Sequence, residues 1–83
     1  MAQVSQTAID IIADLNDKLF EAEWELEQQQ RVVSKYRYYL AADPTADSVM
    51  DLRGSMANLK ACEKKVADIR RSLDKALESI WTL

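Results

Sequence analysis

An apolar stripe with almost no defects runs through the first half of the chain. Its positions advance in alternating steps of four and three residues: Ala8, Ile12, Leu15, Leu19, Ala22, Leu26, Gln29, Val33, Tyr36 and Leu40. An apolar repeat near 3.5 residues keeps one side of a helix against a partner helix, as in a coiled coil. The spacing therefore predicts a long helix that must pack against a second helix.

A second, less regular apolar stripe runs from Val49 to Leu83. Asp43-Pro44 is the turn signal between the two stripes, because the ring of Pro44 disfavours the helical conformation for the residue before it. In this interpretation the whole chain, 1–83, is a single domain. We expect its elements at these approximate bounds: a first helix over 5–41, a turn over 42–44 and a second helix over 44–82.

Both helices have candidate cap residues. Ser5 or Thr7 can accept a hydrogen bond from the first turn of the first helix. Asp43 can cap the second helix with Pro44 at the first helical position, where its missing N–H costs nothing. A start at Asp47-Ser48 is the alternative.

Two helices joined by so short a turn must run antiparallel. The numbers of facing residues should then sum to a nearly constant value. Apolar residues oppose one another in nearly every expected pair: Leu40–Val49, Tyr36–Leu52, Val33–Met56, Gln29–Leu59, Leu26–Cys62, Ala22–Val66, Leu19–Ile69, Leu15–Leu73, Ile12 with Ala76 or Leu77, and Ala8–Ile80. The sequence thus predicts an all-α fold, a long antiparallel two-helix hairpin of the coiled-coil type.

Gly54 falls inside the second helix, either as a tolerated residue or at a close contact between helices.

The charges agree with this pairing and limit the partners. The first helix is acidic over 10–27, whereas the facing part of the second helix is basic, and the signs reverse near the turn. The net charge of −3 offers no long-range attraction to nucleic acid or to anionic lipid. No apolar run approaches the roughly 20 residues of a membrane span. We therefore expect neither nucleic acid nor membrane as a partner.

The small size of the chain favours self-association. A chain of 83 residues buries only roughly 60% of the surface that its unfolded form exposes. Cys62 is the only cysteine and there is no histidine, so neither an internal disulfide nor a plausible zinc site is expected. The remaining route to stability is a partner. We expect a homodimer, in which two hairpins form a four-helix bundle.

Catalytic chemistry has no support in the sequence. There is no histidine base, no glycine loop that could cradle a phosphate and no nucleophile elbow. The carboxylates follow the spacing of a solvated helix surface. We expect no enzyme activity, no catalytic residue, no metal site and no cofactor.

A second set of apolar residues lies off the main stripe: Ile9, Ile11, Phe20, Trp24, Val32, Tyr38, Tyr39, Met50 and Trp81. Phe20 and Trp24 are one helical turn apart and therefore share a face. Exposed aromatic residues commonly anchor interfaces, although these two could instead widen the stripe that covers the hairpin's own core. We predict a protein-binding surface centred on Phe20 and Trp24 and bordered by Glu21, Glu23 and Glu27.

Two further features have alternative interpretations. Gln29 interrupts the apolar stripe, and a polar residue at such a position can fix the register of a coiled coil or contact a partner. Tyr38 and Tyr39 belong to a basic aromatic cluster near the turn. That cluster indicates a protein contact or plain packing, and less strongly a site for single-stranded nucleic acid.

In outline, the chain resembles type III secretion needle subunits and the small helical co-chaperones that hold them. Those families are also short chains of two helices around a tight turn, which in needle subunits usually carries two prolines, whereas here Pro44 stands alone before Thr45-Ala46-Asp47. We expect a small non-enzymatic protein-binding module, such as a chaperone, an adaptor or an inhibitor. The alternative is a self-assembling structural subunit of a filament. The first basic residue is Lys18 and Asp10 interrupts the apolar stretch before it, so we find no secretory signal and expect a cytoplasmic location. Export by a route that uses no cleaved signal is the alternative.

Overall fold

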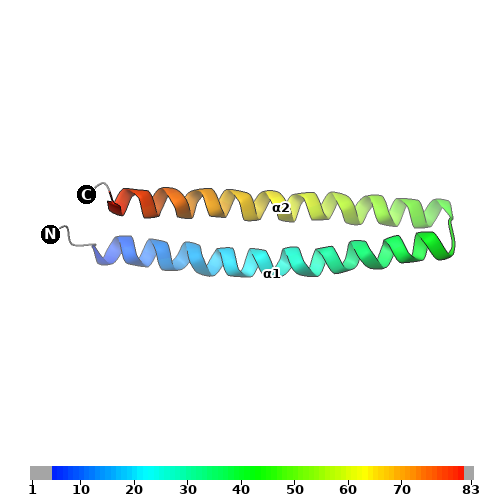
Figure 1. The fold of residues 1–83 in the computed structure, drawn as a ribbon, viewed down its shortest axis with the longest axis horizontal. Coiled ribbons are helices and arrows are strands. Elements are labelled where there is room, and N and C mark those ends of the chain that lie inside the picture. The colour runs from blue at the N-terminus through cyan, green and yellow to red at the C-terminus, as the bar shows by residue number, and fades with distance from the viewer. Residues whose placement is uncertain (1–4, 82–83) are drawn as a thin grey trace.

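A computed structural model describes residues 5–81, which form two long helices packed side by side (Figure 1). Helix α1 spans Gln6–Ala42 and helix α2 spans Ala46–Trp81. The hairpin is 64 Å long and 15 Å by 13 Å across, with the start of α1 and the end of α2 at one end and the turn at the other. The predicted all-α antiparallel hairpin is confirmed, whereas the predicted helix end near Thr82 lies outside the described residues.

Capping hydrogen bonds mark where α1 begins and ends. At the start of α1 the Ser5 Oγ accepts a hydrogen bond of 3.1 Å from the Ala8 N–H, so Ser5 is the cap. At the end of α1 the Asp43 N–H donates to the Tyr39 carbonyl over 2.9 Å. Asp43 has φ −146° and ψ 84°, which is outside the helical region that a following proline disfavours. The last backbone hydrogen bond of α1 therefore has its donor at Asp43, one residue before Pro44.

The start of α2 differs from the prediction. The helix begins at Ala46, and Thr45 rather than Asp43 caps it: the Thr45 Oγ1 accepts a hydrogen bond of 3.0 Å from the Ser48 N–H. The Ser48 hydroxyl in turn donates to the Asp43 carbonyl over 3.0 Å. Because Asp43 already closes α1, the next residue with a side-chain oxygen takes the cap of α2. Pro44 lies between the two caps and not at the first helical position.

The seam of α2 is as regular as that of α1. Its buried and half-buried positions advance in alternating steps of four and three residues: Ser48, Leu52, Ser55, Leu59, Cys62, Val66, Ile69, Leu73, Ala76 and Ile80. The seam of α1 is the predicted one, from Ala8 to Leu40. Pairing the two series from the turn outward gives the same sum of residue numbers for every pair. The facing pairs are therefore a uniform antiparallel ladder.

Two expected pairs near the turn are wrong. Val49 and Met56 do not lie on the seam, because their side chains are 52% and 48% exposed. Ser48 and Ser55 take those positions, and Ser55 is only 5% exposed. A buried serine is tolerated here because its hydroxyl donates to the Leu52 carbonyl of its own helix over 2.8 Å. Ser48 therefore opposes Leu40, and Ser55 opposes Val33.

The core is thin, as it must be between only two helices. Among the described residues, the buried apolar ones are Ala22, Val33 and Val66, and Ala22 faces Val66 with 1% and 2% of their surfaces exposed. Apart from the buried Ser55, the other seam residues are half-buried. Much of the apolar surface of the chain therefore stays on the outside of the hairpin, where a partner could cover it.

Gly54 supplies the first testable prediction. It lies on an exposed side of α2, and apart from its chain neighbours and the backbone of its own helical turns, a Cβ built on it would meet no atom within 4 Å. A close helix contact is therefore not the reason for this glycine. Gly54→Ala should raise the free energy of unfolding by about 0.5–1 kcal/mol, because alanine loses less backbone entropy in a helix. Urea unfolding followed by circular dichroism tests this, and an unchanged or lower stability would contradict it.

Candidate protein-binding surface

Phe20 and Trp24 form a ridge on the outer side of α1. Their side chains are 75% and 59% exposed. Ala22 lies midway between them and is buried against α2. Since successive residues are about 100° apart around a helix, side chains two positions before and after Ala22 lie on the opposite side from it. The two aromatic residues, called the ridge below, therefore do not widen the hairpin's own core.

Glutamates border the ridge on both sides. Two shallow hollows lie beside the aromatic side chains. The glutamates that line them, called the acidic collar below, are Glu21, Glu23, Glu25 and Glu27. Three of them were predicted to border the site, and Glu25 is an addition from the structure. The collar makes this an aromatic surface with an acidic edge.

The collar residues have different local partners. The Glu25 Oε2 lies 3.1 Å from the Lys65 Nζ, and the Glu23 Oε1 lies 3.8 Å from the Arg70 Nη2, so both pairs join α1 to α2. All four side chains are about half exposed, and such exposed pairs contribute roughly 0–1 kcal/mol. These glutamates remain accessible to a partner at little cost.

The other two collar residues stay within α1. Glu27 pairs with Arg31 one turn later, with 3.0 Å between the Oε1 and the Nη2. Glu21 makes no ion pair within residues 5–81. Glu21 is therefore the collar carboxylate that is freest to meet a cation from outside the hairpin.

The tyrosine cluster is a separate feature nearer the turn. Tyr38 and Tyr39 are 71% and 46% exposed, and their rings lie edge to face with centroids 6.2 Å apart. The Lys35 Nζ sits 5.6 Å from the Tyr39 centroid, a cation–π contact inside the chain. Trp24 and Tyr38 are about 21 Å apart along α1 at 1.5 Å per residue. The structure therefore does not join the tyrosines to the ridge.

Gln29 reaches across the seam. Its Nε2 donates a hydrogen bond of 3.0 Å to the Ser55 carbonyl of α2, and the side chain is half-buried. Among the described residues, no buried side-chain nitrogen or oxygen lacks a partner. This polar interruption of the seam is satisfied by the opposite helix, and its role in fixing the register stays a prediction.

The hydrogen bond of Gln29 can be tested against a neighbour. Gln29→Ala should lower the free energy of unfolding by about 1 kcal/mol, because a partly buried hydrogen bond and some packing are lost. Gln30→Ala is the matched control, since Gln30 is exposed. Thermal melts of both variants should separate them, and equal melting temperatures would contradict a structural role for the Gln29 amide.

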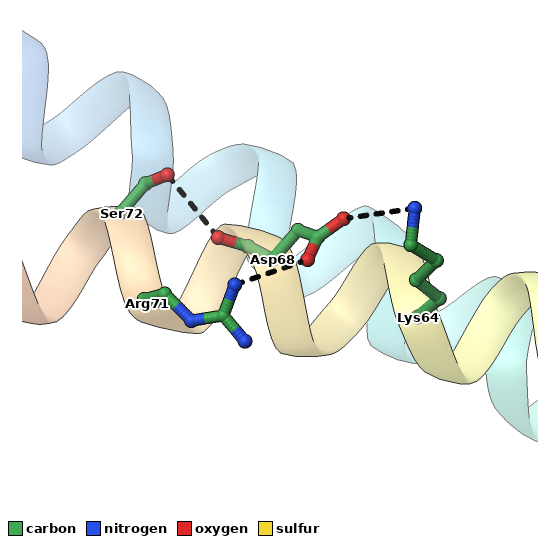
Figure 2. A network of polar contacts seen from close by, with 4 residues as sticks. All are labelled: Lys64, Asp68, Arg71 and Ser72. Atoms are coloured by element: carbon green, nitrogen blue, oxygen red, sulfur yellow. Dashed lines mark hydrogen bonds and ion pairs between the residues drawn. The ribbon is translucent and has the colours of Figure 1, made fainter.

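The opposite charges predicted on the two helices meet only in part. Glu23 and Glu25 pair across the hairpin, but other cations of α2 stay within their own helix. Figure 2 shows Asp68 between Lys64 and Arg71, with oxygen–nitrogen distances of 3.9 Å and 3.5 Å, while the Ser72 hydroxyl donates to the Asp68 carbonyl. Near the turn, where the signs of the charges reverse, no ion pair joins the two helices within residues 5–81.

An apolar groove on α2 was not predicted. Its lining, called the α2 groove below, comprises Val49, Leu52, Arg53, Met56, Ala57 and Lys60. Val49 and Met56 are half exposed because Ser48 and Ser55 occupy the seam. Arg53 and Lys60 make no ion pair in the described part of the chain. The signal that would have revealed this groove is the strict alternation of four and three residues through Ser48 and Ser55. It places Val49 and Met56 outside the seam.

The described residues also bear on a metal site, a reactive thiol and a membrane span. Within residues 5–81, no three of the histidine, cysteine, aspartate and glutamate side chains are placed to hold a metal ion. Cys62 is a free, half-buried thiol on the seam. Neither described helix is long and apolar enough to cross a bilayer. The side chain of Trp81, one of the off-stripe residues, lies outside the described part.

No family model matches the sequence, and neither a curated protein nor a solved structure is significantly similar to it. The likeness to needle subunits and their co-chaperones therefore concerns the helical outline alone. The function of the chain has to be argued from its own surface, on which Phe20 of the ridge is the most exposed large apolar residue among those described.

Proposed function

We propose that this chain is a small non-enzymatic protein-binding module that recognises its partner through the outer face of α1. The observation that carries the proposal is the ridge: two large aromatic side chains, 75% and 59% exposed, one turn apart on a regular helix. Aromatic residues dominate binding hot spots, and exposed apolar clusters commonly mark interaction sites. A chaperone, an adaptor or an inhibitor would act in this way.

The ridge is suited to binding because its aromatic side chains are already presented. An aromatic side chain can bury about 150–250 Å² in an interface. Since Phe20 and Trp24 sit on a continuous helix, little backbone has to be ordered when they bind. The acidic collar favours a partner with a basic border around an apolar groove, and like charges would repel an acidic one.

Self-association is part of the proposal. The hairpin buries only a few apolar side chains fully, and a second copy in the cytoplasm is the partner that is always present. Two aligned hairpins would form the four-helix bundle that the sequence predicts. Tyr38 and Tyr39 would extend such an interface along α1, and Gln29 would hold the register within each hairpin.

A double truncation tests the proposal. Phe20→Ala with Trp24→Ala should weaken association at least tenfold, because hot-spot truncations commonly cost 2 kcal/mol or more. Ile11→Ala with Met50→Ala is the matched control, since these side chains are 51% and 70% exposed but lie off the ridge. Sedimentation velocity and capture from an extract of the source cells measure self-association and partner binding. Equal binding by both variants, with helicity unchanged, would contradict the proposal.

A polymerising structural subunit is the second candidate function. The observation that favours it is that the hairpin carries two different apolar patches, the ridge and the α2 groove. Contacts between unlike patches can propagate into open assemblies. Light scattering over a hundredfold range of concentration separates the candidates: a module reaches a limiting size, whereas a filament subunit keeps growing.

A further inference from the structure

We propose that the ridge of one copy docks into the α2 groove of a second copy of this chain. The inference rests on the proposed function, because it names the occupant of the ridge. It is a contact between two unlike patches, and because every copy carries both, two copies related by a two-fold axis make the contact twice and close into a dimer.

The α2 groove has the chemistry of a receptor for an acidic, aromatic ridge. Its apolar wall includes Val49 and Met56, which are about half exposed and lie off the seam. Its border carries Arg53 and Lys60, which have no carboxylate partner within residues 5–81. An occupant with apolar side chains and flanking carboxylates would cover the wall and pair with both cations.

The ridge offers the complementary set. Phe20 and Trp24 supply the apolar side chains, and Glu21 supplies a carboxylate that has no ion pair within the described range. Contact between two ridges would instead bring two acidic collars together, and such like-charge contacts are costly when desolvated. Charge therefore favours ridge-to-groove docking over ridge-to-ridge docking.

One molecule cannot make this contact by itself. The ridge flanks Ala22, which packs against Val66 of α2. The middle of the α2 groove, at Met56, lies closer to the turn than Val66 does, by about 15 Å along α2 at 1.5 Å per residue. The ridge also points away from α2. A second copy must therefore supply the groove, and because the two patches differ in height, the two hairpins must cross or shift along their axes.

The test uses two variants that each remove one half of the contact. The ridge variant is Phe20→Ala with Trp24→Ala, and the groove variant is Arg53→Glu with Lys60→Glu. All four positions are exposed, so both hairpins should keep their helicity in circular dichroism. Sedimentation velocity of full-length chains, each alone and mixed in equal amounts, measures association. The control replaces Lys75, an exposed cation outside the groove, by glutamate.

We expect the wild-type chain to self-associate and each variant alone to associate at least tenfold more weakly. The equimolar mixture should recover a complex of the two variants, because the intact ridge of one meets the intact groove of the other. Lys75→Glu should behave as the wild type. Recovery on mixing is the result that a ridge-to-ridge contact cannot produce.

The remaining outcomes separate the inference from the proposed function. If the groove variant associates like the wild type while the ridge variant does not, the ridge binds elsewhere and only the inference fails. If the ridge variant keeps full association, the ridge is not the binding surface and both fail. A wild-type chain that stays monomeric at all concentrations overturns the inference, and the cell-extract capture then decides the proposed function.

Discussion

Val66→Asp is expected to unfold the hairpin. Val66 is 2% exposed and packs on Ala22, the most buried residue of α1, so a carboxylate at this position would lie inside the seam. Burying an unpaired charge is among the few single changes that cost more than about 3 kcal/mol. A chain of this length has a free energy of unfolding on the order of 4–12 kcal/mol. The change should therefore remove much of the total stability.

Ala67→Asp is the control for this prediction, because Ala67 is the next residue along α2 and is exposed. Valine and aspartate have similar helix propensities, whereas Ala67→Asp gives up to about 0.7 kcal/mol of propensity away, so a larger loss of stability in Val66→Asp reports burial. Circular dichroism melts should show a large loss of melting temperature for Val66→Asp and a small one for Ala67→Asp. Similar melting temperatures for the two would mean that Val66 is not in the core.

Leu26→Cys should create a disulfide with the native Cys62. The two residues form one rung of the seam, and Cys62 is free and half-buried. Closing the loop between them should stabilise the oxidised form over the reduced form by about 3–4 kcal/mol. For a domain of this size that corresponds to a rise in melting temperature of at least about 10 °C. Comparing the two redox states of one variant cancels the lost packing of Leu26.

The disulfide also tests the register. Glu27→Cys is the control, because Glu27 is exposed on α1 next to Leu26 in sequence and should form no internal bridge. A non-reducing gel should show Leu26→Cys as a cross-linked monomer. A bridge that joins two chains, or an internal bridge in Glu27→Cys instead, would contradict the facing pairs.

The fold was predictable because one physical pattern dominates the chain. Every seam position of α1 except Gln29 is apolar or aromatic, so the alternation of four and three was clear. In α2 the same alternation passes through Ser48 and Ser55, and a search for apolar residues selected Val49 and Met56 instead. Serine can occupy a seam because its hydroxyl bonds to its own helix, as the Ser55 hydroxyl does with the Leu52 carbonyl.

The candidate site was predictable in its centre and not in its surroundings. The position of Phe20 and Trp24 outside the seam followed from the spacing of residues around a helix. The α2 groove did not follow, because it exists only once Met56 is outside the core. Side-chain pairs such as Lys65 with Glu25 depend on which of several nearby cations is in reach, and spacing alone does not decide that.

The central claim, that the chain folds back on itself at Pro44, is tested most directly by a distance between the two ends. Spin labels at Asp10→Cys and Glu78→Cys, with Cys62→Ala and dilution into unlabelled protein, report distances within one molecule. Helices pack about 10 Å apart, so with the label linkers we predict a distance below about 35 Å. One uninterrupted helix would separate the labels by about 100 Å, and the absence of any short distance would contradict the hairpin.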